Sequence, residues 1–528
     1  MNSLTQTQFA LQRKMATILN HFLAFLKEFS STNLTAAVLW LAMAVLMLLI
    51  TSTRSREAKK QRLPPSPPGL PIIGNLHQLG RLPHRALRDI ARKYGPVVYL
   101  RLGLARAVVA TSPEAASQFL KTHDANFASR PPSDAGEFIC YGSRDITFCE
   151  YGSHWRNIKK LCTMKLLSAH KIDSLSWLRK EELTHLVRSI RDSASRQEAV
   201  DVASALVSFS TNMMCRMIFG GRFEDDSMLK TAVKEAMATS GAFNFCDFFP
   251  FVGRLDLQGL RHRMKEVNRM LDDTFECVIE ERLRSTTTQR QQNFMDILLA
   301  TLAGDEGDIP LDRVAMKAIL VDMLVGAIDS GSVMIEWILT ELMKKPQLMR
   351  KLQEEIERAV GLERMVDESD LSKLGYLDMV VKEGFRLHPP APLLAPHLAM
   401  EDSVIMGYDI LKNTRVIVNA WAIGRDPESW TDPEEFIPER FTDLNVDIGG
   451  TDFRIIPFGS GRRRCPGMHL GAAVVRLVMA QLVHCFDWEL PNGMSPEDLD
   501  MEEEFGLTVP RKNSLVAVPT YRLLGDAV

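Results

Sequence analysis

Beyond residue 80, apolar residues recur every three or four positions along most of the chain, which is the spacing of helices with one buried face. The longest such stretches predict helices over residues 84–94, 179–196, 200–219, 256–285, 311–345 and 347–360. Two short apolar runs, at residues 96–103 and 106–111, lie close together and predict a β-hairpin. The pattern therefore predicts a mostly α fold with small β-sheets near its beginning and end, in the α+β class.

An uncharged segment at residues 29–53 precedes this pattern near the start of the chain. Its apolar centre, LTAAVLWLAMAVLMLLI, would span about 26 Å as a helix, near the short end of what a bilayer requires. Five basic residues follow directly and favour the cytoplasmic side: Arg54, Arg56, Lys59, Lys60 and Arg62. We expect a single membrane anchor with the remaining chain in the cytosol. A cleaved signal peptide, a transit peptide and a buried core helix are the alternatives.

The predicted anchor separates an N-terminal extension from a hinge and the body of the protein. Residues 1–28 form an N-terminal extension whose apolar stretch ATILNHFLAFLKEF is able to lie as a helix at the membrane surface. Residues 54–80 combine the basic cluster with LPPSPPGLPIIGN, a stiff and extended proline-rich run that predicts a hinge. The body of the protein follows at residues 81–528.

Composition narrows the function classes. The net charge is −3 and the pI is about 6.5, so no overall basic character indicates nucleic-acid binding. The chain lacks the GxGxxG, GxxxxGK[ST], HExxH and GxSxG motifs. None of its eight cysteines forms a CxxC pair, and all but one are expected to be ordinary buried thiols. A redox enzyme with this sequence would take its electrons from a separate protein.

The remaining cysteine lies in an unusual loop, PFGSGRRRCPGMHLG. Phe458, Gly461, Arg463, Cys465 and Gly467 fall in the order F-x-x-G-x-R-x-C-x-G. Glycines allow close backbone approach, nearby arginine favours a thiolate, and the positive end of the helix that follows stabilises an anion. The alternative is a glycine turn with an incidental thiol, which five residues in register argue against.

This spacing resembles the haem-binding loop of the cytochrome P450 family, in its plant microsomal form. The resemblance implies that residues 81–528 form a haem-thiolate catalytic domain with the cytochrome P450 fold, behind an N-terminal transmembrane anchor helix. It assigns Cys465 as the metal ligand of haem b (iron protoporphyrin IX). It also assigns Phe458, Arg463 and Gly467 to cofactor binding.

Two further motifs fit the resemblance. KEGFRLHPP carries Glu383 and Arg386 as an E-x-x-R on a predicted helix, which alone would be an ordinary surface ion pair. PERF follows and places Arg440 25 residues before Cys465. The resemblance implies that Glu383, Arg386 and Arg440 lock together as a buried network behind the haem loop, for which the planar guanidinium is suited.

One long predicted helix contains GAIDSG at residues 326–331, where several helix-weakening residues lie together. The segment resembles the family pattern [AG]-G-x-[DE]-T-[TS] of the helix over the haem. That resemblance implies Asp329 and Ser330 as the catalytic residues, which relay protons to bound dioxygen. Ala327, Ser330 and Gly331 depart from the pattern, although Ser330 keeps a hydroxyl. The alternative is a helix kink with no chemistry.

Further residues are expected to hold the cofactor. SHWRNIKKL offers Trp155 and Lys159 where family members have W-x-x-x-R. The resemblance implies that both bind a haem propionate, with His397 and Arg463 as further propionate partners. Lysine is a less rigid stand-in for arginine. An ordinary core or surface histidine is the alternative for His397.

The resemblance implies a monooxygenase that hydroxylates a lipophilic small molecule with dioxygen and with electrons from NADPH through a separate NADPH–cytochrome P450 reductase. A basic surface is expected to receive this reductase, with a solvated face as the alternative: Arg156, Lys159, Lys160, Arg462 and Arg464. The expected membrane is that of the endoplasmic reticulum.

Three segments are expected to line the substrate pocket, at residues 127–155, 391–396 and 503–510. The first contributes five apolar side chains: Phe138, Ile139, Tyr141, Ile146 and Phe148. Apolar lining indicates a lipophilic substrate. FASRPP and FGSGRRRCPG most resemble plant enzymes of secondary metabolism, so a terpenoid is the first expectation and a phenolic or flavonoid the second. A reductase-independent haem-thiolate isomerase or dehydratase and a membrane-tethered binding protein are the rival functions.

Overall fold

The computed structural model describes residues 61–221, 227–284, 293–304, 309–444 and 446–524. The chain divides into two compact units, Met1–Leu63 and Pro64–Val528. The predicted N-terminal extension and the predicted anchor at residues 29–53 lie outside the described residues.

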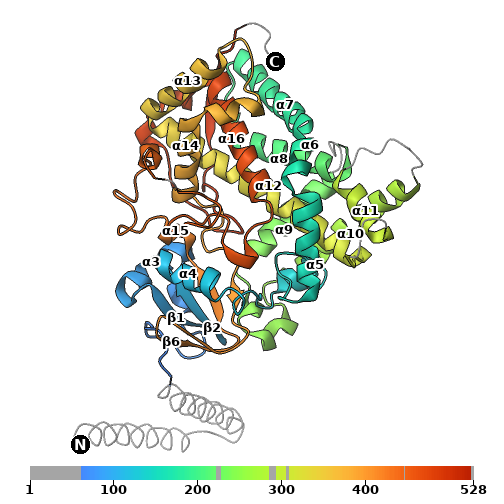
Figure 1. The fold of residues 1–528 in the computed structure, drawn as a ribbon, viewed down its shortest axis with the longest axis vertical. Coiled ribbons are helices and arrows are strands. Elements are labelled where there is room, and N and C mark those ends of the chain that lie inside the picture. The colour runs from blue at the N-terminus through green and yellow to red at the C-terminus, as the bar shows by residue number, and fades with distance from the viewer. Residues whose placement is uncertain (1–60, 222–226, 285–292, 305–308, 445, 525–528) are drawn as a thin grey trace, which may run out of the picture. The chain divides into compact units, whose positions relative to one another are not determined.

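Helices dominate the unit Pro64–Val528 (Figure 1). They are α3 (Pro83–Tyr94), α4 (Pro113–Ser117), α5 (Ser153–Leu161), α6 (Ala169–Ser174), α7 (Ser176–Ser195), α8 (Val202–Phe219), α9 (Ser227–Gly241), α10 (Leu260–Arg284), α11 (Phe294–Ala303), α12 (Arg313–Lys344), α13 (Pro346–Val360), α14 (Gly375–Leu387), α15 (Ala420–Ile423) and α16 (Met468–Cys485). All the helices predicted from the apolar spacing are present, with ends that differ from the predicted ones by a few residues.

Side-chain caps fix where several helices begin. Asp312 precedes α12, and its carboxylate accepts a hydrogen bond from the first turn. Asn293 caps α11 in the same way and forms a reciprocal capping box with Asp296. Asp201 caps α8, which explains why β3 (Val200–Asp201) takes the place of the first turn of the helix predicted there.

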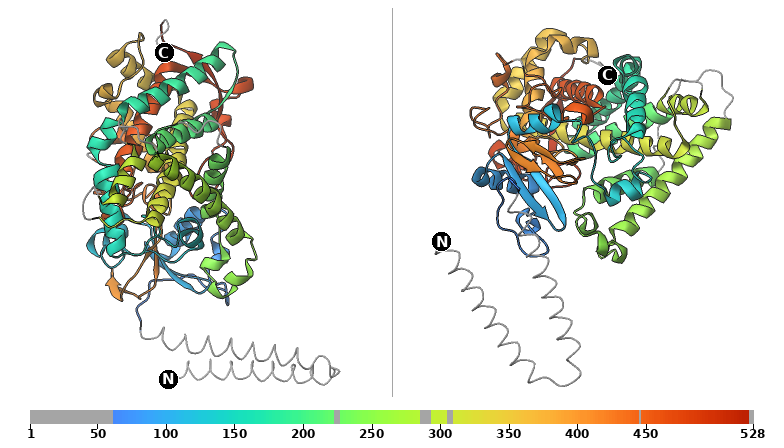
Figure 2. Two further views of the ribbon diagram at one scale, coloured as in Figure 1. Left: turned by 90° about the vertical axis from the view of Figure 1, so that its right-hand side faces the viewer. Right: turned by 60° about the horizontal axis from the view of Figure 1, so that its bottom comes forward.

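Three small sheets complete this unit, with strand orders β1-β2-β7-β4, β3-β9-β8 and β5-β6. The strands other than β3 are β1 (Val97–Leu102), β2 (Ala105–Ala110), β4 (His397–Leu398), β5 (Ser403–Ile405), β6 (Tyr408–Ile410), β7 (Arg415–Val418), β8 (Phe486–Glu489) and β9 (Val516–Tyr521). β1 and β2 pair antiparallel, with Leu102 opposite Ala105, which confirms the predicted hairpin. Figure 2 shows these early strands, in blue, beside later strands, in orange, in agreement with the parallel pairing of β2 and β7.

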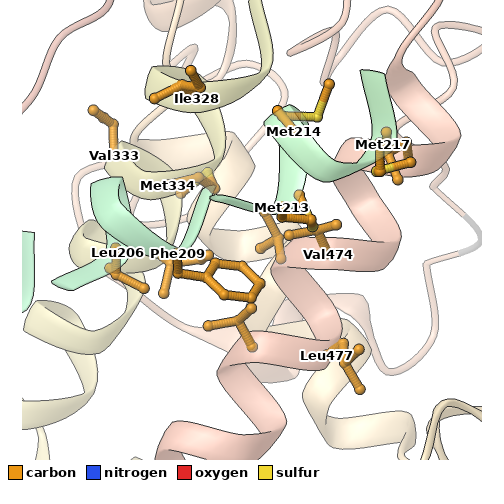
Figure 3. Packing of buried hydrophobic residues seen from close by; sticks show 14 of the residues in the cluster. Leu206, Phe209, Met213, Met214, Met217, Ile328, Val333, Met334, Val474 and Leu477 are labelled. Atoms are coloured by element: carbon orange, nitrogen blue, oxygen red, sulfur yellow. The ribbon is translucent and has the colours of Figure 1, made fainter. Parts of the chain in front are cut away.

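The core lies where α8, α12 and α16 pack together (Figure 3). Phe209 and Met213 from α8 belong to the same buried cluster as Met334 from α12 and Val474 from α16. Among the described residues, these three helices are long and apolar enough to cross a membrane, by length and composition alone. However, 56% to 72% of their most apolar windows is buried inside the protein. Core packing therefore accounts for their composition.

The proline-rich segment is held against β1. From Pro64 onward it belongs to the same compact unit as the body. The side-chain oxygen of Asn75 accepts a hydrogen bond from the N–H of Arg101 at 2.9 Å, and its amide donates to the carbonyl of Pro67 at 3.2 Å. These contacts hold residues 64–75 against β1.

A buried acid joins α3 to the loop at residues 499–515, which precedes β9 and is called the C-terminal loop below. Glu503 is 8% exposed, and its carboxylate lies 2.9 Å from Nε2 of His84. The carboxylate also accepts hydrogen bonds from Arg85 at 2.7 Å and from the indole N–H of Trp421 at 3.2 Å. Burial acts to raise the pKa of Glu503, but His84 and Arg85 outweigh it and lower the pKa to about 2.

We expect Glu503→Gln to lower the free energy of unfolding by about 2–3 kcal/mol near pH 7. The pKa of Glu503 in the folded state lies below that in the unfolded state. The contribution is therefore complete above about pH 5 and is lost as the pH falls towards about 2. Thermal unfolding of both forms should show a smaller difference near pH 4 than near pH 7.

Glu502→Gln is the matched control for this comparison. Glu502 adjoins Glu503 but forms an exposed ion pair with Lys512, whose loss is expected to change stability by at most about 1 kcal/mol. Equal losses from the two variants would contradict the assignment of stability to the buried pairs.

Candidate functional site

The cysteine loop turns sharply before α16. Gly461 has a φ of +66°, and a Cβ at this position would lie 2.0 Å from the carbonyl oxygen of Leu120, so only glycine fits. The N–H of Cys465 donates to the carbonyl of Phe458 at 3.0 Å and closes the loop. α16 begins three residues after Cys465. The loop therefore places the cysteine just before the N-terminus of a long helix.

Donors and positive charge converge on the sulfur of Cys465. The thiol is open to an internal cavity, while protein atoms surround it on its other sides. Burial raises the pKa of the thiol, and the N–H groups of Gly467 and Met468 act in the opposite direction together with Lys159 and Arg464. This arrangement favours a thiolate once a metal ion shares its charge.

The cavity beside Cys465 has a volume of about 260 Å³. Gly326, Ser330 and Gly331 of α12 line it. Most of the predicted cofactor-binding residues also lie on its lining: Trp155, Lys159, His397, Phe458 and Arg463. Gly467 is not on the lining but caps the N-terminus of α16. The structure thus brings the predicted metal ligand and most predicted cofactor contacts around one space.

Two arginines of this cavity lack an anionic partner. Arg130 and Arg463 each donate three hydrogen bonds to main-chain carbonyls, and among the described residues neither forms an ion pair with a carboxylate. Burial and the charge of Arg463 lower the pKa of Arg130 to about 9, and burial lowers the pKa of Arg463 to about 10. An anion in the cavity would compensate both charges.

The other predicted propionate partners are held by main-chain atoms. The indole N–H of Trp155 donates to a carbonyl at 3.0 Å, and Nζ of Lys159 donates to another at 2.6 Å. Nδ1 of His397 lies 2.8 Å from the carbonyl oxygen of Phe127, and burial keeps the pKa of this ring well below its ordinary value. The guanidinium of Arg463 stacks 4.2 Å from the centre of the Trp155 ring. The roles of these side chains towards a propionate stay predictions.

Glu383 and Arg386 form a fully buried ion pair on α14. Nε and Nη2 of Arg386 donate to the two carboxylate oxygens at 2.7 and 2.8 Å. Arg440 donates to the same carboxylate at 3.0 Å. Nη1 of Arg386 reaches the main chain, including the carbonyl of Gly424 at 2.6 Å. A single carboxylate thus balances two guanidinium groups inside the protein.

Two neighbouring polar residues at the centre of α12, Asp329 and Ser330, have different surroundings. The helix runs unbroken through residues 326–331, so its weak residues do not interrupt it. The hydroxyl of Ser330 donates to the carbonyl of Gly326 at 2.8 Å. Asp329 accepts a hydrogen bond from Thr508 of the C-terminal loop. Ser330 lines the cavity with Cys465, whereas Asp329 does not.

The residues around this cavity fit an iron porphyrin. Cys465 offers a sulfur ligand, and the rings of Phe385 and Phe458 offer flat apolar contacts. Arg130 and Arg463 offer two positive charges that form no ion pair with a carboxylate of the described chain. A flat apolar ring with iron at its centre and carboxylates at one edge matches this set of groups.

A cytochrome P450 family model matches residues 64–518. The chain belongs to the cytochrome P450 family. It is 50% identical to cytochrome P450 CYP736A12 of Panax ginseng, over 88% of this chain and 94% of that protein. It is 41% identical to flavonoid 3'-monooxygenase CYP75B137 of Crocosmia x crocosmiiflora, over 93% and 99% of the two chains. It is 39% identical to premnaspirodiene oxygenase of Hyoscyamus muticus, over 90% and 96%.

A solved structure shares the fold. A zebra fish cytochrome P450 with abiraterone superposes with a TM-score of 0.71 at 24% identity, over 83% of this chain and all of that chain. The cytochrome P450 fold, mostly helical with small sheets, is therefore confirmed. Because its relatives are plant monooxygenases, this cytochrome P450 is a plant oxidoreductase of the monooxygenase class.

A second cavity of this cytochrome P450, of about 1320 Å³, shares Arg130, Thr147 and Ala395 with the first. All three segments predicted to line the substrate pocket reach it, the first through Phe148 and the last through Phe505. Its lining also carries charged side chains, which the apolar segments did not indicate: Arg81, Arg85, Arg130, Asp247, Arg415, Asp500, Glu502, Glu503, Glu504 and Lys512.

Some of the residues predicted to line the substrate pocket do not line a cavity described above. Phe138, Ile139 and Tyr141 line neither of these cavities, and Ile139 is 1% exposed within the core. Ile146 lines the smaller cavity. The apolar spacing alone could not separate a core residue from a pocket residue, because both face away from water.

Two residues of the site, Arg130 and Thr508, lie in segments predicted to line the substrate pocket but were not singled out from the sequence. Arg130 stands in FASRPP as a single charge within an apolar and proline-rich stretch, and this isolation was the available signal. Thr508 carried no signal of its own, since its partner Asp329 lies 179 residues away.

Proposed function

We propose that this cytochrome P450 hydroxylates a lipophilic small molecule of plant secondary metabolism, with dioxygen and with electrons from NADPH through a separate reductase. The observation that carries the proposal is the convergence of N–H donors on Cys465, at a cavity that shares three lining residues with a larger one. A terpenoid is the first substrate class. A phenolic or flavonoid is the second, and the similarity to a flavonoid 3'-monooxygenase supports its inclusion.

In this proposal the chain holds haem b through its own side chains. Cys465 would ligate the iron through its thiolate, and Phe458 and Gly467 shape the loop around it. Five side chains would hold the propionates: Arg130, Trp155, Lys159, His397 and Arg463. Bound haem supplies oxygen activation and hydroxylation of a C–H bond, which thiolate ligation favours. The protein contributes a thiolate, compensating charge and an apolar wall that excludes water.

Asp329 and Ser330 deliver protons. Ser330 lines the cavity, and rotation of its side chain turns its hydroxyl from the carbonyl of Gly326 towards that space. Burial raises the pKa of Asp329, which makes its carboxyl a proton donor at a higher pH than an exposed aspartate.

In this proposal, other parts of the chain and of its surface bind the membrane and the reductase. An anchor at residues 29–53, after the extension at residues 1–28, holds the domain on the cytosolic face of the endoplasmic reticulum. Residues 54–80 act as the hinge. Exposed basic side chains near the cysteine loop form the docking face for an acidic reductase: Arg156, Lys160, Arg462 and Arg464. Lys159 supports this face through its hydrogen bond to the carbonyl of Arg464.

A reduced carbon monoxide difference spectrum of the full chain in membranes tests the haem-thiolate assignment. We expect the Soret band that is typical of thiolate ligation, because Cys465 is the cavity's sulfur ligand. A spectrum that shows haem without thiolate ligation would contradict the proposal.

Incubation with a panel of terpenes and phenolics, with and without reductase, then tests the reaction. Hydroxylated product should require NADPH, dioxygen and reductase together. Turnover of a hydroperoxide without NADPH and reductase would favour the isomerase or dehydratase. A spectral shift on ligand addition without any product would favour the binding protein.

A further inference from the structure

The carboxyl group of Asp329 has one hydrogen-bond partner among the described residues, the hydroxyl of Thr508. Burial raises the pKa of Asp329, and this hydroxyl acts in the opposite direction. Few charged groups face it: Glu336 lies two turns further along α12, and Asp201 and Arg511 face Glu336. Within the described part of the chain, the charge of Asp329 therefore depends on a single neutral donor.

Thr508 presents its hydroxyl from a fixed loop. The residue is 7% exposed. The indole N–H of Trp337, on α12, donates to the carbonyl of Val509 at 2.9 Å. The N–H of Gly506 donates to the carbonyl of Thr508 at 3.0 Å and closes a turn. The loop is thus bonded to the same helix that carries Asp329.

We propose that Thr508 is a positioning residue for the monooxygenase reaction, whose hydroxyl holds the carboxyl of Asp329 in place behind Ser330. The proposal rests on the proposed role of Asp329 in proton delivery. At residues 330 and 331, where the family pattern has two hydroxyl side chains, this helix has one hydroxyl and Gly331. Thr508 brings a second hydroxyl to Asp329 from 179 residues away.

The contact can be measured without turnover. Thr508→Val removes the hydroxyl and keeps the branched shape. Because the hydroxyl stabilises the ionised carboxyl, we expect the unfolding equilibrium to shift roughly tenfold near pH 8 and less than about threefold near pH 4. In an Asp329→Asn background, the loss of stability caused by Thr508→Val should no longer depend on pH. An equal loss of stability at both pH values in both backgrounds would contradict the assigned contact between Thr508 and Asp329.

Turnover with the reductase tests the role. Asp329 acts as an acid, so the rate falls as the pH rises above its pKa. Thr508→Val raises that pKa, so the alkaline limb of the pH profile should move up by about one unit. Product formed per NADPH should fall by roughly threefold, because the acid is no longer held in place. Thr508→Ser keeps the hydroxyl, so its alkaline limb and its product per NADPH should match those of the wild-type chain.

Two outcomes would overturn this role. The first is an unchanged alkaline limb with unchanged product per NADPH in Thr508→Val. The second is a wild-type chain that forms no NADPH-dependent product, which would also overturn the proposed function. The stability comparison distinguishes these cases, since it reports the contact between Thr508 and Asp329 whatever the activity.

Discussion

Replacement of Cys465 by alanine (Cys465→Ala) is expected to abolish both the thiolate-type Soret band and NADPH-dependent product formation. The other seven cysteines do not line the cavity that Cys465 faces, so none of them can take its place. Alanine leaves the N–H groups of Gly467 and Met468 without the sulfur that they face. The full chain, purified from membranes, should therefore lose most of its haem and all of its catalysis.

Cys149→Ala is the matched control. Cys149 is buried, and burial raises the pKa of its thiol to about 11, so it is an ordinary protonated thiol. It lies close to the same site, since its carbonyl accepts a hydrogen bond from Arg463. This variant should keep the pigment and the activity. Unchanged colour and turnover in Cys465→Ala would contradict the assignment of the iron ligand.

The second large effect is expected from Glu383→Gln, at a cost of about 3–5 kcal/mol in the free energy of unfolding. The carboxylate of Glu383 is the anion for both Arg386 and Arg440, and the pair that it forms with Arg386 is fully buried. Glutamine keeps the shape but leaves two guanidinium groups without a counter-charge inside the protein. Thermal unfolding and haem retention of the full chain measure the loss.

Glu266→Gln is the matched control for this variant. Glu266 and Arg269 have the same spacing on a helix as Glu383 and Arg386, but both are exposed and their charged atoms lie 3.6 Å apart. We expect a change of less than about 0.5 kcal/mol. Similar small losses from both glutamine variants would show that the buried network contributes little.

The helices were predictable because each buries one face over many residues, so the period of the apolar positions repeats often enough to be recognised. The start of α8 was not predictable in this way. Val200 pairs with Ala517 of β9, and this strand comes from the far end of the chain. A local pattern of apolar residues carries no information about such a pairing.

The same distinction holds within the site. Cys465 and its neighbours form one continuous motif, in which the glycine, arginine and cysteine positions follow from local geometry. Arg130 depends instead on the carbonyl of Ala395, 265 residues away, and Asp329 depends on Thr508. These partners meet only after the domain has folded. The sequence could therefore predict the chemistry of Asp329 but not that its side chain bonds to Thr508.

The glycines around the haem cavity differ in the freedom that they leave for engineering. At Gly326 and Gly331 a Cβ would meet no protein atom and would face the cavity proposed for the haem, whereas the carbonyl of Leu120 fills that space at Gly461. Alanine in a helix is favoured over glycine by about 1 kcal/mol, so extra atoms on α12 do not weaken the fold. Directed evolution towards other products can therefore start from these two positions and leave the turn before the cysteine unaltered.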